Sequence, residues 1–193
     1  MIAKYKVIVL FLFIFLQTSV FSQDLGKAYF AGGCFWCMEE SFEKKEGVLE
    51  VISGYSGGTT KNPTYEEVTY GNTGHFETIE IIFDKNKTNY NDLLDHFWKN
   101  IDPFDAYGQF CDKGYSYRSV AFYENDQQMD LIEKSITKLE KKFKKKIVTY
   151  VRKFDKFYVA EDGHQDYYEV KFLNYLRYKK ACGREETLSR ILN

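Results

Sequence analysis

The chain contains few prolines and almost no net charge. Only Pro63 and Pro103 occur among its 193 residues, and 27 lysines and arginines nearly balance 28 acidic residues. A net charge of −1 argues against a nucleic-acid partner held by bulk electrostatics. A thioredoxin-like disulfide oxidoreductase needs a cis-proline that faces its disulfide. Both prolines here fall in loops rich in other polar residues, which counts against that class.

Cysteine is also scarce, and its spacing argues against two common uses. The four cysteines form one close pair, Cys34 and Cys37, and two distant single residues, Cys111 and Cys182. This is not the spacing of a disulfide scaffold. A four-cysteine zinc site usually needs two close pairs. We therefore expect no bound metal.

The apolar stretch near the N-terminus is too short for a comfortable membrane span of about 20 residues. It covers residues 7–16, follows Lys4 and Lys6, and precedes a short polar segment. This layout is typical of an export signal. We expect residues 1–22 to be a signal peptide and residues 23–193 to be one catalytic domain, exported to the periplasm or the exterior. An uncleaved anchor and a buried helix are the alternatives.

The order of the expected elements indicates the fold class. Hydrophobic periodicity predicts strands at 25–32, 48–55, 75–83 and 119–123, helices at 34–45, 89–100, 126–145 and 164–176, a helical turn at 65–70, and a bent strand pair or one long strand at 147–159. The core order is therefore βαββαβ, which predicts an α+β fold of the ferredoxin-like type with a C-terminal tail. Two extended loops, around 53–78 and 102–118, are long enough to carry function.

Cys34 and Cys37 are the most informative residues of the chain. They follow an apolar run and two glycines, and helix-forming residues come after them. This pattern predicts a strand, a tight turn and a helix start. A thiol at a helix N-terminus lies near unpaired N–H groups and the positive end of the dipole, which favours the nucleophilic thiolate. The second cysteine can close a disulfide with the first, so the spacing suits a thiol that attacks and is then resolved.

Several polar residues in the two long loops could assist a thiol. Tyr65 and Tyr117 are either ordinary core or surface tyrosines, or hydrogen-bond donors to an anionic or dipolar oxygen. Glu77 is either an exposed strand residue or a partly buried, protonated general acid. Asp112 taken alone is most simply a turn residue. An aromatic-rich binding module, which the 18% aromatic content permits, would not explain the cysteine pair beside Glu77.

Together these segments resemble the A-type peptide methionine sulfoxide reductases, over about residues 27–188. The segments Gly-Cys-Phe-Trp, Asn-Pro-Thr-Tyr, Gly-His-x-Glu and Tyr-Arg-Ser occur in the family's order and spacing, and residues 160–168 are similar to its late signature. Each segment alone is weak, but five in order are specific.

The resemblance implies a set of roles in one pocket: Cys34 as nucleophile, Phe35 and Trp36 as the apolar wall for the S-methyl group, Tyr65 and Tyr117 as the phenols that hold the sulfoxide oxygen, Glu77 as its proton donor, and Asp112 as a further acid. It implies reduction of methionine-S-sulfoxide, free and in oxidised proteins, in repair of oxidative damage. It also implies no bound cofactor and an external thioredoxin-like dithiol as reductant. We expect a monomer that has no membrane association once the signal peptide is cleaved.

The thiol that resolves the Cys34 sulfenic acid stays open at this point. Cys37 is favoured because it is one helical turn away. Cys182 lies in the expected tail, where some relatives keep a recycling cysteine. Cys111 occupies a position that is usually not cysteine in the family.

Overall fold

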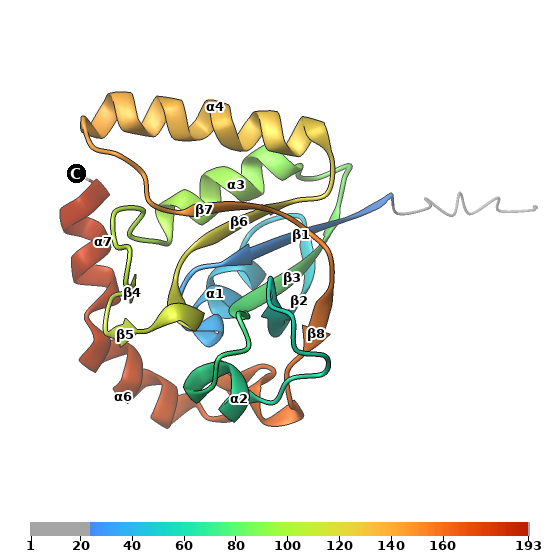
Figure 1. Ribbon diagram of the computed structural model, residues 1–193, viewed down its shortest axis with the longest axis vertical. Coiled ribbons are helices and arrows are strands. Elements are labelled where there is room, and N and C mark those ends of the chain that lie inside the picture. Colours follow the sequence, from blue (N-terminus) through green and yellow to red (C-terminus); the bar gives the residue numbers. More distant parts are fainter. Residues whose placement is uncertain (1–23, 193) are drawn as a thin grey trace, which may run out of the picture.

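A six-stranded sheet lies at the centre of the computed structural model, which describes residues 24–192 (Figure 1). The sheet order is β7-β6-β1-β3-β2-β8, with β1 at Leu25–Ala31, β2 at Val48–Ser56, β3 at Phe76–Asp84, β6 at Val120–Tyr123, β7 at Tyr150–Lys153 and β8 at Phe157–Val159. Neighbouring strands are antiparallel, except that β7 runs parallel to β6. A separate two-stranded hairpin joins β4, Gly108–Gln109, to β5, Asp112–Lys113.

The helices complete an α+β architecture, as the sequence predicts. Their bounds are Phe35–Glu43 (α1), Tyr65–Tyr70 (α2), Tyr90–Lys99 (α3), Asp126–Phe143 (α4), Tyr167–Val170 (α5), Phe172–Cys182 (α6) and Arg184–Leu192 (α7). The core follows the chain order β1-α1-β2-β3-α3-β6, with α2 inserted before β3. No described helix is long and apolar enough to cross a membrane. The expected signal peptide lies outside the described residues.

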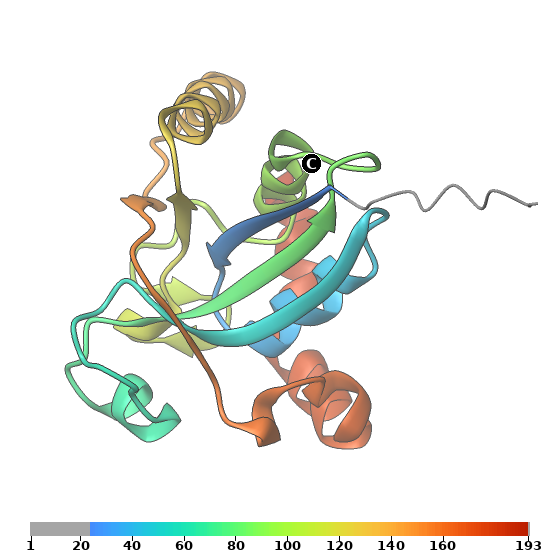
Figure 2. The ribbon, with the colours of Figure 1, turned by 90° about the vertical axis from the view of Figure 1, so that its right-hand side faces the viewer.

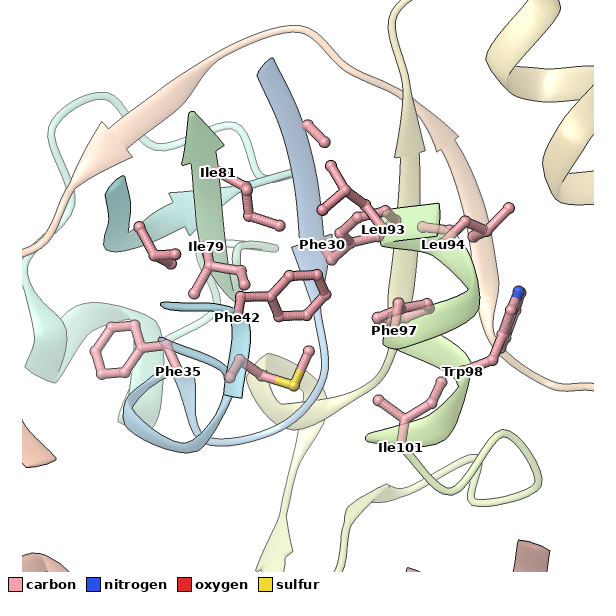
Figure 3. Packing of buried hydrophobic residues seen from close by; sticks show 14 of the residues in the cluster. Phe30, Phe35, Phe42, Ile79, Ile81, Leu93, Leu94, Phe97, Trp98 and Ile101 are labelled. Atoms are coloured by element: carbon pink, nitrogen blue, oxygen red, sulfur yellow. The ribbon is translucent and has the colours of Figure 1, made fainter. Parts of the chain in front are cut away.

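The main core lies between the sheet and helices α1 and α3 (Figure 3). On α1, Phe35 and Phe42 lie two turns apart and are both buried, as the helical period requires. On α3, Phe97 stacks on Phe30 of β1 with ring centroids 4.7 Å apart. Burying a phenylalanine contributes about 1.5–3 kcal/mol relative to leaving it exposed. Aromatic anchors of this kind therefore fix α1, and with it the cysteine pair, against the sheet.

The opposite face of the sheet is covered by the chain between β7 and β8. Figure 2 shows this segment passing from one edge of the sheet to the other. Phe154 stacks on Tyr29 of β1, with centroids 3.7 Å apart, and Phe157 packs beside it. Of the two alternatives for 147–159, one long strand is wrong, and the expected two strands are present as β7 and β8, which pair with β6 and β2 and not with each other. The sequence there forms two short strands on opposite edges, because its aromatic residues cover the sheet face between them.

The expected C-terminal tail is also wrong. Residues beyond 176 continue α6 to Cys182 and then form α7. Gly183 separates the two helices with a φ of +63°, a conformation that glycine adopts without strain. Tyr175 and Arg184 are 1% and 5% exposed, so both helices pack on the domain through single large residues rather than through an apolar stripe.

Candidate active site

Cys34 lies where β1 ends and α1 begins, as predicted. It is the N-cap residue of α1, and its side chain makes no capping hydrogen bond. The turn before it requires glycine at position 33, where φ is +81° and a Cβ would lie 2.5 Å from that of Gln109. This tight turn therefore places Cys34 at the start of α1.

Cys34 lines a cavity of about 230 Å³, called here the Cys34 pocket. Its other lining residues are Phe35, Trp36, Tyr65, Glu77, Asp112, Tyr117 and Tyr178. The pocket thus brings together residues from β3, α1, α2, α6 and both long loops. The first six of these were expected in one pocket from the sequence, and Tyr178 was not. Cys37 and Cys182 do not line the Cys34 pocket.

Glu77 is a buried acid that faces Cys34. It is 2% exposed, and its Oε2 accepts a hydrogen bond of 3.0 Å from the backbone N–H of Phe35. Burial raises the pKa of Glu77 to about 8, and the negative charge of Asp112 acts in the same direction. The hydrogen bonds from Phe35 and Tyr117 only partly oppose this rise. At neutral pH the carboxyl is therefore mostly protonated and can donate a proton.

The two thiols of the pair contact each other. Both are buried, and the Cys34 thiol hydrogen-bonds the Cys37 sulfur. Burial, and then this hydrogen bond, raise the pKa of Cys34, although a hydrogen bond from Tyr178 opposes the rise. Burial and the contact with Cys37 therefore oppose the thiolate that the helix N-terminus favours at Cys34. The pKa of Cys37 is lowered to about 7, chiefly by the hydrogen bond from Cys34.

Tyr65 and Tyr117 contribute a pair of hydroxyls to the lining of the pocket. Their side chains hydrogen-bond each other, and burial raises the pKa of both, so both are neutral donors at physiological pH. Glu161, from the late sequence segment, fixes Tyr65. Its Oε1 accepts from the Tyr65 backbone N–H and its Oε2 from the Tyr55 hydroxyl, each at 2.8 Å. The late segment therefore supports the pocket instead of lining it.

With this geometry in place, comparison with known proteins decides the family. A family model for peptide methionine sulfoxide reductase matches residues 26–193. The chain belongs to the peptide methionine sulfoxide reductase family. It is 49% identical over 164 residues to the peptide methionine sulfoxide reductase MsrA of Listeria monocytogenes, which covers 84% of this chain and 93% of that one. It is 48% identical over the same length to the protein of that name from Bacillus subtilis, with the same coverage.

Solved structures agree with the sequence comparison. The reduced form of Mxr1 from Saccharomyces cerevisiae matches with a TM-score of 0.71 and 27% identity, covering 76% of this chain and 85% of that one. Methionine sulfoxide reductase A of Corynebacterium diphtheriae matches with a TM-score of 0.69 and 28% identity, covering 76% and 74%. The α+β fold class, the family and its oxidoreductase class are therefore confirmed. The individual residue roles stay predictions.

Within this reductase family fold, α6 supplies a pocket residue and α5 a residue that packs on the pocket wall, and neither was given a role from the sequence. Tyr178 lies beside Cys34, and its hydroxyl donates a hydrogen bond to Asp112. Tyr167 stacks on Trp36, with centroids 3.8 Å apart and planes 9° apart. The Trp36 indole N–H also donates to Nδ1 of His164, at 3.3 Å. The available signal was the spacing of Tyr175 and Tyr178, three residues apart, which places both on one helical face.

A disulfide joins Cys111 to Cys182, with Cα atoms 4.9 Å apart. The structure thus pairs the two less favoured candidate resolvers with each other, while Cys34 and Cys37 are free. The bond ties the end of α6 to the loop that carries Asp112.

Two groups of described side chains bring possible metal ligands within 4.8 Å of one another. The first, Cys111, Asp112 and Cys182, has both of its sulfurs in the disulfide. In the second, Glu39, Glu43 and Asp166, burial raises the pKa of Glu39 to about 8. The proximity of three acidic side chains is not by itself evidence for a metal centre.

Proposed function

We propose that the protein reduces methionine-S-sulfoxide, free and in oxidised proteins, to methionine, with Cys34 as nucleophile and Glu77 as general acid. The observation that carries this proposal is the meeting of a free thiol and a buried, protonated carboxyl in one aromatic-lined pocket. Phe35 and Trp36 offer an apolar wall to the S-methyl group. The hydroxyls of Tyr65 and Tyr117 can donate to the sulfoxide oxygen.

The chemistry follows from the protonation states. A sulfoxide sulfur is a poor electrophile until its oxygen is protonated or strongly hydrogen-bonded. Neutral Glu77 can supply that proton while the Cys34 sulfur attacks. The oxygen atom is transferred from the sulfoxide to the thiol, so that methionine and a Cys34 sulfenic acid are the products. The thiol proton restores Glu77 over the step.

Cys37 then resolves the sulfenic acid. It is free, and its sulfur already accepts a hydrogen bond from Cys34. Its attack on the Cys34 sulfur forms the Cys34–Cys37 disulfide and releases water, and an external dithiol then reduces this disulfide. A thioredoxin-like protein is the proposed reductant. In support, the yeast relative Mxr1 has been solved in complex with Trx2, a structure that matches this chain with a TM-score of 0.53 and 19% identity.

The test is thioredoxin-coupled NADPH consumption, with the S and R epimers of methionine sulfoxide added separately. We expect consumption that depends on the S epimer and is lost in Cys34→Ser. Matched Cys111→Ser/Cys182→Ser protein, which keeps the free pair, should still consume NADPH. Consumption with a disulfide substrate and none with sulfoxide would instead identify a disulfide oxidoreductase.

We also propose export of the protein, with cleavage near Ser22. The support is the basic and apolar layout of the first 22 residues. Mass spectrometry of the protein purified from its native host tests it. A soluble cytoplasmic protein that begins at Met1 or Ile2 would rule out export.

A further inference from the structure

Arg184, the first residue of α7, is a buried cation. It is 5% exposed, and it forms no ion pair with any carboxylate in the described part of the chain. Its guanidinium donates to the carbonyl oxygens of Gly32 and Asn100 and contacts the Met38 sulfur at 3.0 Å, while its other side lies 4.5 Å from the centre of the Phe110 ring. Burying a charge is costly unless an opposite charge lies near. A nearby anion would therefore stabilise the buried charge of Arg184.

Cys37 and Asp112 are two groups near Arg184 that can carry negative charge, and the charge of Arg184 acts to lower the pKa of both. Arg184 and Cys37 line the same cavity of about 310 Å³ between α1, α6 and α7, called here the Cys37 cavity, which is distinct from the Cys34 pocket. The low pKa of Cys37, about 7, has several causes. The hydrogen bond from Cys34 is the largest, burial opposes it, and the charge of Arg184 and a hydrogen bond from Tyr175 lower the pKa further.

Among the described charged groups around Cys37, Arg184 is the one available to stabilise a Cys37 thiolate. The titratable and charged groups that face Cys37 are Cys34 of α1, Glu77 of β3, Asp112 of β5, Tyr175 and Tyr178 of α6, and Arg184 of α7. The Cys37 cavity is also lined by Glu40, Lys44, His96, Lys179 and Glu185. Both lysines are already paired, with nitrogen–oxygen distances of 2.6 to 3.0 Å to these two glutamates. Arg184 is the cation lining the Cys37 cavity that forms no salt bridge with a carboxylate among the described residues, although its charge also acts to lower the pKa of Asp112.

The disulfide flanks the residues that hold Arg184. Cys182 is two residues before it, and Gly183 lets the chain turn into α7. Cys111 directly follows Phe110, whose ring packs on the guanidinium. The Cys111–Cys182 bond therefore fixes both the cation and the ring that covers it.

We propose that Arg184 is a positioning residue for the second half of the cycle: its guanidinium is the counter-charge that keeps Cys37 a thiolate, ready to attack the Cys34 sulfenic acid. This inference rests on the proposed function, in which Cys37 is the resolving thiol. In the step, the Cys37–Cys34 sulfur–sulfur bond forms and the Cys34 sulfur–oxygen bond breaks. Hydroxide leaves and takes up a proton to become water. Because the thiolate is the nucleophile, loss of Arg184 should slow this step and spare the first.

The test titrates Cys37 directly in a Cys34→Ser background, where it is the one free thiol because Cys111 and Cys182 are paired. The rate of alkylation by iodoacetamide is measured against pH. We expect Arg184→Gln to raise the midpoint of the alkylation-rate profile by about one pH unit or more. At a pH below both midpoints this corresponds to about a tenfold smaller fraction of Cys37 thiolate. Arg184→Lys should raise it less. Arg190→Gln, which removes an exposed arginine from the same helix, should leave it unchanged.

An unchanged midpoint in Arg184→Gln would overturn the proposal. Equal shifts in Arg184→Gln and Arg184→Lys would also overturn it, because the effect would then come from the shape of the side chain and not from its charge. If Arg184→Gln does not fold, Arg184→Met tests the same point, because it removes the charge and keeps an unbranched side chain against Met38 and Phe110. It too should raise the midpoint, and an unchanged midpoint would overturn the proposal. The proposed function is tested separately, by the rate of disulfide formation in the Arg184→Gln variant that retains Cys34. A raised midpoint with an unchanged rate would contradict Cys37 as the resolver.

Discussion

The substitution Glu77→Gln separates hydrogen bonding from proton donation at the sulfoxide oxygen. The carbonyl of the introduced amide can still accept the 3.0 Å hydrogen bond from the Phe35 N–H, so the buried side chain keeps its partner. The amide can hydrogen-bond the substrate but cannot release a proton. General acid catalysis is worth about 10²–10⁴-fold, so we expect the first turnover to slow by about 10²-fold or more. This corresponds to about 2.7 kcal/mol of transition-state stabilisation.

The pH dependence gives a second readout of the same group. The pKa of Glu77 is about 8, so the carboxyl is protonated below that pH and loses its proton above it. The acid-dependent part of the wild-type rate should therefore fall above about pH 8, and Glu77→Gln should lack that fall.

The assay is a quenched single turnover without reductant, in which methionine is counted. Glu66→Gln, at an exposed glutamate of α2, is the control. A Glu77→Gln rate within about threefold of wild type would show that this carboxyl is not the acid.

Three further predictions concern the thiols and a second buried acid. Cys37→Ser should give a first turnover near wild type and then stop in the thioredoxin-coupled assay; full turnover there, with a stop in Cys182→Ser, would reverse the assignment. Replacing both Cys111 and Cys182 by Ser removes a disulfide between residues 71 apart in the sequence, and urea unfolding should show a free energy of unfolding lower by about 4 kcal/mol on the loop-entropy estimate. Equal stability would contradict a stabilising role for this disulfide. Burial raises the pKa of Glu39 to about 8, so its contribution to stability is complete below about pH 4.5 and is lost as the pH rises through 8. Glu39→Gln should therefore lose less stability than wild type between about pH 5 and pH 9 in thermal unfolding, and parallel curves would refute this.

Local sequence patterns predicted most of the central fold. The strand at β1, the helix that begins at Cys34 and the turn at Tyr65–Tyr70 all follow from alternation, glycine placement and helical period. The expected helix at 164–176 covers α5 and the first part of α6, but the end of α6 and all of α7 did not follow, because α6 and α7 have weak apolar stripes. Val170, Phe172, Leu173 and Leu176 are exposed, and Tyr175 is the large residue of this segment that is buried. Periodicity cannot reveal a helix whose packing depends on single residues.

The candidate site was predicted where short motifs carry it and missed where tertiary contacts do. Cys34, Tyr65, Glu77 and Tyr117 lie in recognisable segments, and the structure brings them to one pocket. Tyr178 reaches the same pocket from a helix more than 60 residues further along the chain, through contacts with Cys34 and Asp112. The raised pKa of Cys34 was also missed, because Tyr175 and Tyr178 of α6 help to bury the helix start, and the sequence did not reveal their packing.

In the proposed reaction, Cys34 takes the oxygen of the sulfoxide and becomes a sulfenic acid, and Cys37 then forms a disulfide with Cys34. The most direct measurement is a single turnover without reductant, with one equivalent of methionine-S-sulfoxide, followed by peptide mapping of all disulfides. We expect one methionine per chain, a new Cys34–Cys37 disulfide, and an unchanged Cys111–Cys182 bond. Methionine formed while Cys34 remains a free thiol, or formed equally by Cys34→Ser, would contradict it.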